Sequence, residues 1–477
     1  MCIGHGAQIR LLLKKLRLSI ILLLLWGATV QAQVRSQAPD LAQSGVRESD
    51  ARLPQQHREP QVAKRGAETA AAREMLTIKQ AERLFAERSR ELLLAQQAVE
   101  AADADRTSAA AQPNPNLFIN ATQFGNLYPA GYDYSRLDRR ADIVVGLNRT
   151  FERGGKRELR MAVANSNAKA SRYDLSDVRR AQKAVLHSAY YDLVLAQEKV
   201  RITGLTSASF HRTLDAVALR LKAGDIAPSD VARIQVDALR AENDARAAGA
   251  EREKAQTALA YLTGLEARAR AIEAADGRPA IEDAAPGVDL EKILDARPDV
   301  AAAQARVRAA EEKRALAQTL RTRHVTGSVQ FERVPWNPLA NPTAVNTVGF
   351  GVSIPLFTNY HFEGEIHRAE VERTTARMNL EKTRALALGE IESSRADLES
   401  AIDRVRRFDG ELLAQAQKAA DAAEFAYGQG AIGVMDLLDS RRQLYVTRLE
   451  ASAAQADYAK ALAAWRAAIE TPSVTPP

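Results

Sequence analysis

The chain repeats its own pattern once along its length. Residues 224–231 align with residues 430–437, an offset of 206 (430 − 224), and residues 146–151 align with 351–356, an offset of 205 (351 − 146). One insertion or deletion between these two anchors reconciles the offsets. Self-similarity at a fixed period indicates a duplicated architecture. Each half is therefore expected to contain the same series of elements: a helix, two strands, a long helix, a break and another helix.

The two longest segments of helical composition, 155–222 and 362–427, contain no proline. A helix of about 65 residues extends roughly 100 Å, whereas helices of globular proteins average about a dozen residues. Shorter helices are predicted over 76–111, 229–262, 299–320 and 434–468. Apolar residues recur at heptad spacing in both halves: Leu186, Ala189, Leu193, Ala196 and Val200, then Leu444, Ala451, Tyr458 and Trp465. Alanine at such positions allows close coiled-coil packing, so a long antiparallel helical wall is expected.

Four segments are strand-like: 116–124, 141–151, 324–332 and 347–356. In the last three, apolar residues alternate with small or polar ones, although Val144 interrupts the polar face of the second. In the last of these, Val348, Phe350 and Val352 alternate with glycines and polar residues. Such strands suit a membrane barrel with lipid outside and water inside, although a sandwich with one buried face has the same alternation. Four strands cannot close a barrel, and an open edge is not tolerated in lipid. A barrel therefore requires several chains, and three chains give twelve strands.

The N-terminus has the features of an export signal. Basic residues between Arg10 and Arg17 precede a short apolar core, and Val30-Gln31-Ala32 predicts cleavage before Gln33. A retained anchor helix is the alternative. The single cysteine, Cys2, lies in the predicted signal peptide of residues 1–32, so the mature chain needs no disulfide. Residues 33–75 are expected to form a flexible leader, 266–298 a linker between the repeats 76–265 and 299–470, and 471–477 a short tail.

Charge and motifs exclude several classes of function. Removing 1–32 removes four of the 66 Lys and Arg and none of the 60 Asp and Glu, which leaves 62 − 60, or +2. That balance implies no nucleic acid partner. After residue 32, no segment approaches the apolar length of a membrane-spanning helix. The sequence contains no phosphate-binding loop, no nucleophile elbow and no pair of histidines at helical zinc spacing. We therefore expect neither an enzyme nor a bound cofactor or metal.

Two motifs at the helix breaks resemble those of the TolC-like outer-membrane efflux protein family. The first runs from Arg220 to Gln235 and its copy from Tyr427 to Asp439. The turn at 150–157 is similar to that of the CzcC-like branch, which serves heavy-metal cation pumps. The resemblance covers about 75–470 and implies a mainly α-helical fold with a small β part. In that fold, a homotrimer closes a twelve-stranded outer-membrane barrel that continues into a long coiled-coil barrel of twelve helices. A belt of mixed structure, expected from 76–111, the 264–298 linker and the C-terminus, girdles the helices.

The resemblance also implies a place and partners. The trimer would sit in the outer membrane of a Gram-negative bacterium, with a long periplasmic extension. It would conduct substrate passively, working with a periplasmic adaptor (membrane fusion protein) and an inner-membrane RND pump. The substrates implied by the branch are heavy-metal cations. Export of drugs or proteins through the same fold, or a non-channel coiled-coil envelope protein, are the alternatives.

Site residues are expected at the two breaks, 223–228 and 428–433, which the resemblance places at the periplasmic tips. Asp436 and Asp439 match positions that ring the narrowest part of the entrance, where six carboxylates would attract cations; the alternative is that both simply begin a helix. Residues expected at the tips and in adaptor docking are Gly224, Asp225, Ile226, Pro228, Asp230, Gly430, Ile432 and Gly433. For Asp230, a helix-capping role is the preferred interpretation. Arg233 and Tyr427 are expected to make contacts that close the gate.

Overall fold

The computed structural model describes residues 73–122, 142–282, 289–334 and 345–471 of the chain. The predicted signal peptide, nearly all of the predicted leader and most of the predicted tail lie outside these residues. The helices are α2 (Ile78–Arg88), α3 (Arg90–Ala110), α4 (Lys156–Ala223), α5 (Pro228–Thr263), α6 (Leu290–Ala296), α7 (Pro298–Gln318), α8 (Glu363–Arg407), α9 (Leu413–Gly428) and α10 (Val434–Ile469). The strands are β1 (Glu74–Leu76), β2 (Asn116–Thr122), β3 (Asp142–Phe151), β4 (Ile272–Ala274), β5 (Val325–Val334) and β6 (Val345–Ser353). Among the described residues, no helix has an 18-residue stretch apolar and uncharged enough to cross a membrane.

Paired elements in the two halves have matching lengths. Helices α5 and α10 each contain 36 residues, and α3 and α7 each contain 21. Helix α4 has 68 residues. Its counterpart is α8, continued by the π-helical turn Phe408–Leu412 and then by α9. The repeat seen in the sequence is thus also a repeat of structure.

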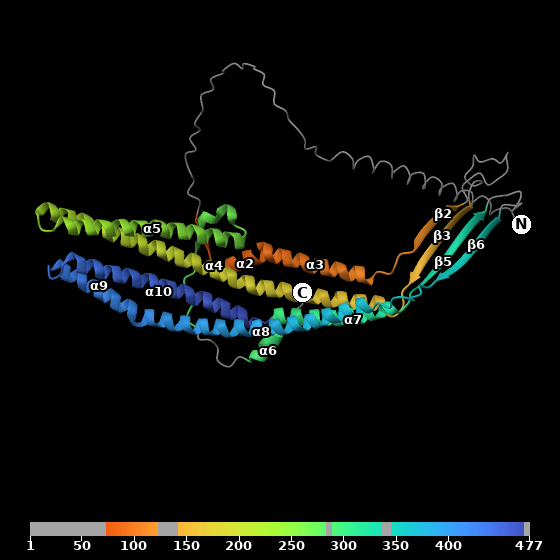
Figure 1. The fold of residues 1–477 in the computed structure, drawn as a ribbon. Helices are drawn as coiled ribbons and strands as arrows, with labels where there is room; N and C mark the ends of the chain where they lie inside the picture. The colour runs from red at the N-terminus through yellow and green to blue at the C-terminus, as the bar shows by residue number, and fades with distance from the viewer. Residues whose placement is uncertain (1–72, 123–141, 283–288, 335–344, 472–477) are drawn as a thin grey trace, which may run out of the picture. The chain divides into compact units, whose positions relative to one another are not determined.

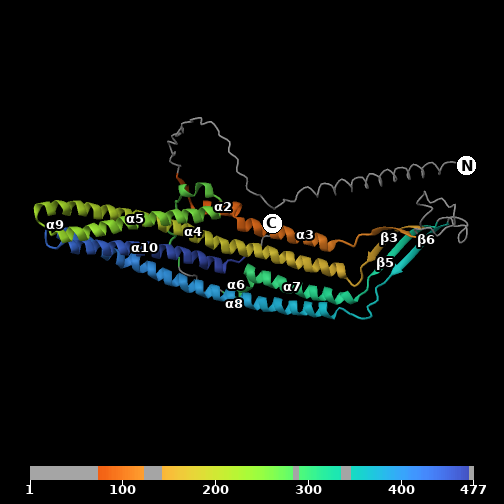
Figure 2. The same ribbon diagram turned by 45° about the horizontal axis from the view of Figure 1, so that its top comes forward.

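The long helices run side by side, as Figures 1 and 2 both show, and α4 packs against α3, α5, α7 and α10. Their contacts follow the heptad positions. Leu186, Leu193 and Ala196 are buried on α4, and all four predicted seam residues of α10 from Leu444 to Trp465 are buried. Ala189 and Val200 are half-buried. Small side chains at these seams let neighbouring helices approach closely along their length.

The four longer strands form one antiparallel sheet in the order β2-β3-β5-β6. Both views place this sheet at the opposite end of the long helices from the α4–α5 and α9–α10 turns (Figures 1 and 2). Within the described residues, each strand begins and ends within three residues of its predicted bounds, while residues 123–124 and 141 of the predictions lie outside.

The helix predicted over 76–111 is in fact two helices. Thr77 and Gln80 form a capping box that begins α2, and this reciprocal pairing satisfies two backbone donors at the helix start. The helix ends at Ser89, where the backbone is extended (φ −62°, ψ 122°) before α3 begins. The described part of the expected linker contains a 3-10 turn (Glu266–Ala271), β4 and α6.

The short strand β4 is fastened to the long helices by side chains. It pairs in parallel with β1. The hydroxyl of Tyr190 on α4 donates to the carbonyl of Leu76 (2.9 Å) and accepts from the amide of Asp276 (3.0 Å). Gln256 on α5 donates to the carbonyl of Ile272 (2.8 Å). These bonds satisfy backbone groups that would be costly to bury unpaired, so the segment becomes a fixed belt beside the helices.

The helix predicted over 362–427 is interrupted by the π-helical turn, which contains Gly410. Glycine in a helix interior weakens the helix because its backbone loses more conformational freedom on folding than that of any other residue. Neighbouring side chains hold the turn: Asp409 accepts from Arg278 (2.6 Å) and from Gln455 of α10 (3.2 Å).

A buried cluster of charges joins four helices near the middle of the chain's helical wall. Arg297, between α6 and α7, is 0% exposed. Its guanidinium donates to Asp299 (3.1 and 2.8 Å), to Glu390 of α8 (2.6 Å) and to the carbonyl of Ala468 at the end of α10 (3.0 Å). Arg180 of α4 also donates to Glu390 (3.0 Å) and to the neighbouring α10 carbonyl (3.1 Å). The two arginines therefore cap the C-terminus of α10, where positive charge is favourable.

Candidate functional site

One face of the four-stranded sheet is apolar and continuous across the strands. Two rows of large side chains run across it in register: Leu117, Leu147, Val329 and Phe350, then Ile119, Val145, Phe331 and Val348. Their exposed fractions range from 36% for Val145 to 82% for Phe350. A contiguous apolar patch of this kind marks a surface that is covered by lipid or by protein.

The opposite face of the sheet has mostly small and polar residues, although Phe118 and Val144 also lie on it and the Phe118 ring lies across Gly146. The hydroxyls of Thr150 and Thr326 lie 3.0 Å apart across β3 and β5. A Cβ added at Gly351 would lie 2.5 Å from the hydroxyl oxygen of Ser328. Glycine is therefore required on β6 for that polar side chain to lie across the sheet. The sheet thus has one apolar face and one mostly polar face.

Both edges of the sheet are open in the single chain. Within the described residues, β2 pairs only with β3, and β6 pairs only with β5. An open edge presents unpaired backbone donors and acceptors, which proteins cover by closure or by pairing with another strand. The sheet therefore has two unpaired edges among the described residues.

At the other end of the helices, two tight turns connect antiparallel helices. Gly224 and Gly430 have φ angles of 85° and 73°, a conformation that glycine adopts without steric cost. Pro228 is the first residue of α5 and Asp230 lies in its first turn, where proline's fixed φ and a negative charge both fit. Gly433 precedes α10 as its N-cap.

The remaining predicted tip residues lie on or beside these turns. Asp225 is exposed, whereas Ile226 and Ile432 are half-buried. Ile226 packs against an apolar cluster that joins α4, α5 and α10, formed by Phe210, Val217, Ile234, Ala238, Ala241, Val434 and Leu438. The two hairpins, α4–α5 and α9–α10, are thus held together by a small core close to the tips.

An ion pair crosses between the two hairpins beside this core. Arg442 of α10 donates to Asp237 of α5 (2.9 Å), and the Asp237 side chain is only 12% exposed. The same guanidinium also donates to Asp439 (3.1 Å) on its own helix. Arg442 therefore connects one of the predicted pore carboxylates to the other hairpin.

Two further polar contacts link the hairpins. Arg220 of α4 donates to the hydroxyl of Tyr427 on α9 (2.8 Å), and its guanidinium lies 5.0 Å from the centre of the Tyr427 ring. Arg441 of α10 donates to the hydroxyl of Thr213 on α4 (3.0 Å) and pairs with Glu424 of α9 (3.2 Å). Three separate polar links thus fix one hairpin against the other.

Of the two predicted gate residues, Tyr427 contacts the other hairpin and Arg233 does not. Tyr427 takes part in a link between the hairpins. Arg233 is exposed on α5, and in the described part of the chain it has no ion pair or side-chain hydrogen bond; Asp237, one turn further along, makes the contact instead. Asp436 and Asp439 are both exposed and lie three residues apart on α10. The sequence did not identify the arginines of the links as contact residues: Arg220 begins the first tip motif, and Arg441 and Arg442 follow its copy.

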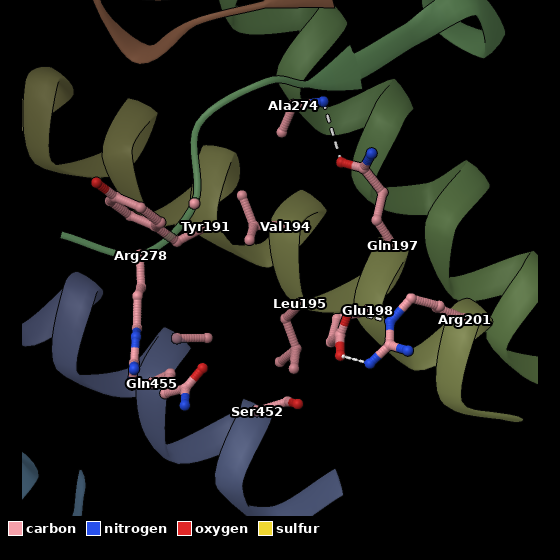
Figure 3. Close-up of a pocket in the computed structure, with 12 residues that line it drawn as sticks. Tyr191, Val194, Leu195, Gln197, Glu198, Arg201, Ala274, Arg278, Ser452 and Gln455 are labelled. Carbon is pink, nitrogen blue, oxygen red and sulfur yellow. Dashed lines mark hydrogen bonds and ion pairs between the residues drawn. The ribbon is translucent and has the colours of Figure 1, made fainter. Parts of the chain in front are cut away.

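A cavity of about 360 Å³ lies between α4, α10 and the segment after β4 (Figure 3). Tyr191 and Leu195 line it from α4, and Ser452 and Gln455 line it from α10. Its charged groups are already paired: Glu198 with Arg201, as the figure shows, and Arg278 with Asp409. Among the described residues, no group of three or more His, Cys, Asp or Glu side chains is placed to hold a metal ion. The cavity therefore presents no nucleophile with an adjacent base and no metal centre.

The chain matches the model of the outer membrane efflux protein family over residues 81–265 and 290–470. It is 26% identical to the cobalt-zinc-cadmium resistance protein CzcC of Cupriavidus metallidurans over 317 residues, which cover 64% of this chain and 71% of that protein. It is also 26% identical to the pyoverdine export outer membrane protein OpmQ of Pseudomonas aeruginosa over 356 residues, 70% of this chain and 72% of that protein.

Solved structures have the same fold. CusC matches with a TM-score of 0.70 at 18% identity, covering 83% of this chain and 92% of that one. The outer membrane protein VceC of Vibrio cholerae matches with a TM-score of 0.65 at 18% identity, covering 83% of this chain and 96% of that one. Each of the two ranges that match the family model, 81–265 and 290–470, contains one copy of the duplicated helix–strand pattern. The chain therefore belongs to the outer membrane efflux protein family, whose members are efflux channels and not enzymes.

Proposed function

We propose that this chain forms the outer-membrane exit channel of a tripartite export system as a homotrimer. The observation that carries this proposal is the sheet with an apolar face, a polar face and two open edges. If β6 of one copy pairs with β2 of the next, three copies of the four-stranded sheet close a barrel of twelve strands with no free edge. The apolar rows then face lipid and the small polar residues line a wet lumen.

The helical wall continues the lumen away from the membrane. Three copies of the long helices would form a twelve-helix tunnel in the periplasm, with the two turns of each chain at its far end. A periplasmic adaptor would dock at those turns, where Asp225 is exposed and Ile226 and Ile432 are half-buried. An inner-membrane RND pump would supply the energy, since a passive duct has none of its own. A non-channel coiled-coil protein of the envelope has no use for the exposed apolar sheet face.

The proposed substrates are divalent heavy-metal cations. The relative CzcC is named for cobalt, zinc and cadmium resistance, and two exposed carboxylates, Asp436 and Asp439, begin α10 at the tip. Six such carboxylates around one entrance would attract cations and repel anions. The second candidate is export of an organic compound, because the relative OpmQ is named for pyoverdine export.

Deleting the gene should sensitise cells to divalent metals. We expect reduced growth on graded Zn, Co, Cd, Ni or Cu salts, with growth on dyes and antibiotics unchanged. The wild-type copy should restore tolerance. A copy with Asp436→Asn and Asp439→Asn should restore less of it, because the entrance loses its attraction for cations.

The matched control for those variants is Asp397→Asn with Asp421→Asn, which removes two exposed carboxylates from α8 and α9. This control should complement like the wild type. Sensitivity to drugs alone, with metal tolerance intact, would contradict the metal assignment and favour the organic substrate.

The Arg442–Asp237 ion pair is proposed to hold the tip closed. Arg442→Ala should raise the open probability of reconstituted trimers in planar bilayers. A partly exposed ion pair contributes about 0.5–1 kcal/mol, which corresponds to about two- to fivefold in open probability per protomer. Arg240→Ala is the matched control, because Arg240 pairs with the same Asp237 (3.9 Å) from within α5 and links no hairpins. Equal open probability of the Arg442→Ala and Arg240→Ala trimers would contradict the gate assignment.

A further inference from the structure

Three chain connections meet where the sheet joins the helices: 152–155 after β3, 322–324 before β5 and 354–362 after β6. Lys156 donates to the carbonyl of Thr322 (2.7 Å), and Arg321 donates to the carbonyl of His361 (3.1 Å). At Gly154, which has a φ of 79°, an added Cβ would lie 3.0 Å from the side chain of Thr322. The three connections therefore form one packed junction at the end of the strands (Figure 1).

An open cavity of about 620 Å³ lies in this junction and is strongly basic. Its lining residues are Arg153, Arg321, Thr322, Arg323, Phe357, His361 and Glu363. Three arginines thus face a single carboxylate. The nearby Glu152 does not offset them, because both of its oxygens accept from Arg160 (2.6 and 2.8 Å).

The arginines of the cavity have unused hydrogen-bonding capacity. Within the described residues, Arg153 is exposed and makes no ion pair or side-chain hydrogen bond. The guanidinium of Arg323 lies over the ring of Phe357 at 5.7 Å, which leaves the donors at its edge free. Arg321 uses one donor for the carbonyl of His361. Guanidinium groups pair with phosphate through two parallel hydrogen bonds.

Phe357 lines the same cavity, and the connection that contains it also has other apolar and aromatic side chains. Leu356 is 72% exposed and Tyr360 is 49% exposed on the connection that contains Phe357. The rings of Phe357 and Phe362 meet edge to face at 5.0 Å. Phe362 is also the only non-glycine among the described residues with a positive φ, 63°. Such a conformation is costly for a bulky residue and clusters at functional sites.

The position of the cavity indicates what kind of phosphate-containing molecule would reach its arginines. It lies at the end of the apolar sheet face, where a barrel's aromatic girdle meets the lipid headgroups. We propose that this junction cavity binds the phosphodiester headgroup of an anionic phospholipid, with the acyl chains lying along the apolar sheet face. The inference rests on the proposed function, since it requires the sheet to face lipid. Binding of this headgroup holds the channel at a fixed depth in the leaflet nearest the helices.

The test is binding of fluorescently labelled phosphatidylglycerol to the purified full-length protein in detergent micelles, with labelled phosphatidylcholine as the zwitterionic comparison. The wild type should prefer phosphatidylglycerol. The triple variant Arg153→Gln, Arg321→Gln, Arg323→Gln should lose about tenfold or more of that affinity, since each basic group near a lipid surface contributes measurably. A control with Arg240→Gln, Arg246→Gln and Arg395→Gln removes three exposed arginines from α5 and α8 and should bind like the wild type.

A second variant keeps the test independent of folding at the junction. Glu363→Gln removes the cavity's one carboxylate and should tighten phosphatidylglycerol binding severalfold. Equal affinity in the cavity and control triple variants, or no change with Glu363→Gln, overturns the proposal. It is also overturned if inorganic phosphate displaces the lipid at similar concentration, because the site would then be one for free phosphate. Trimer formation and conductance, measured on the same samples, report on the channel separately: a conducting trimer without selective lipid binding leaves the proposed function standing.

Discussion

Replacing Arg297 with alanine is expected to destabilise the helical part of the protein by about 3–5 kcal/mol, the usual cost of leaving a buried charge without its partner. Arg297 is fully buried and donates at once to Asp299, to Glu390 and to the carbonyl of Ala468 near the end of α10. The temperature at which the detergent-solubilised protein loses its helical circular dichroism should therefore fall by several degrees.

The control for this substitution is Arg377→Ala. Arg377 of α8 pairs with Glu311 of α7 at 2.6 Å, and both side chains are about half exposed (52% and 43%). Removing such a surface pair costs about 0–1 kcal/mol. If the two variants unfold at the same temperature, the buried cluster does not stabilise the wall as the structure indicates.

The same cluster should weaken in acid. Burial by itself would raise the pKa of Glu390, but the hydrogen bonds from Arg297 and Arg180 outweigh it and hold that pKa below its usual range. The pKa of Asp299 is lowered against burial in the same way, chiefly by Arg297. A carboxylate with a lowered folded pKa contributes stability above its ordinary pKa of about 4 and loses it as the pH falls through the lower folded value. Between about pH 6 and about pH 3, Arg297→Ala should therefore lose less thermal stability than the wild type does.

Phe350→Arg is expected to abolish assembly in the outer membrane. Phe350 is 82% exposed and lies on the edge strand β6, at the end of one apolar row and paired with Val329. An arginine on the lipid face near the bilayer midplane costs about 2–4 kcal/mol, and a trimer contains three copies of the change. Outer-membrane fractions run on gels without boiling should lose the trimer band.

Thr347→Arg is the matched control on the same strand. Residue 347 lies on the opposite, polar face and pairs in register with Glu332, so a lumenal arginine there has a carboxylate beside it. This variant should still reach the outer membrane as a trimer. If Phe350→Arg assembles as well as Thr347→Arg does, the apolar face is not the lipid face.

Local patterns predicted the long elements because those patterns are strong. Alternation over eight to ten residues located β3, β5 and β6, whose one apolar face matches the period of a strand. The short strands β1 and β4 have only three residues each and pair across 198 positions (272 − 74). No local period can indicate such a pair. The π-helical turn was missed for a related reason, since Asp409 is held there by partners far along the chain, Arg278 and Gln455.

At the tips, backbone requirements were predictable and side-chain partners were not. Glycine and proline spacing indicated the turns at Gly224 and Gly430, because those residues have strong conformational preferences. The pairing of Arg442 with Asp237 depends on how one hairpin lies against the other, which is a tertiary property. The burial of Arg297 was equally hidden, since an arginine before a proline reads as an exposed loop residue.

The most direct test of the channel is to reconstitute the protein purified from outer-membrane fractions into planar bilayers and record single-channel currents, after sizing the sample without heating. The account predicts a heat-sensitive trimer with discrete, cation-preferring conductance steps. A monomer recovered from the soluble periplasm, or a trimer that never conducts even when Arg442 is replaced by alanine, would contradict it.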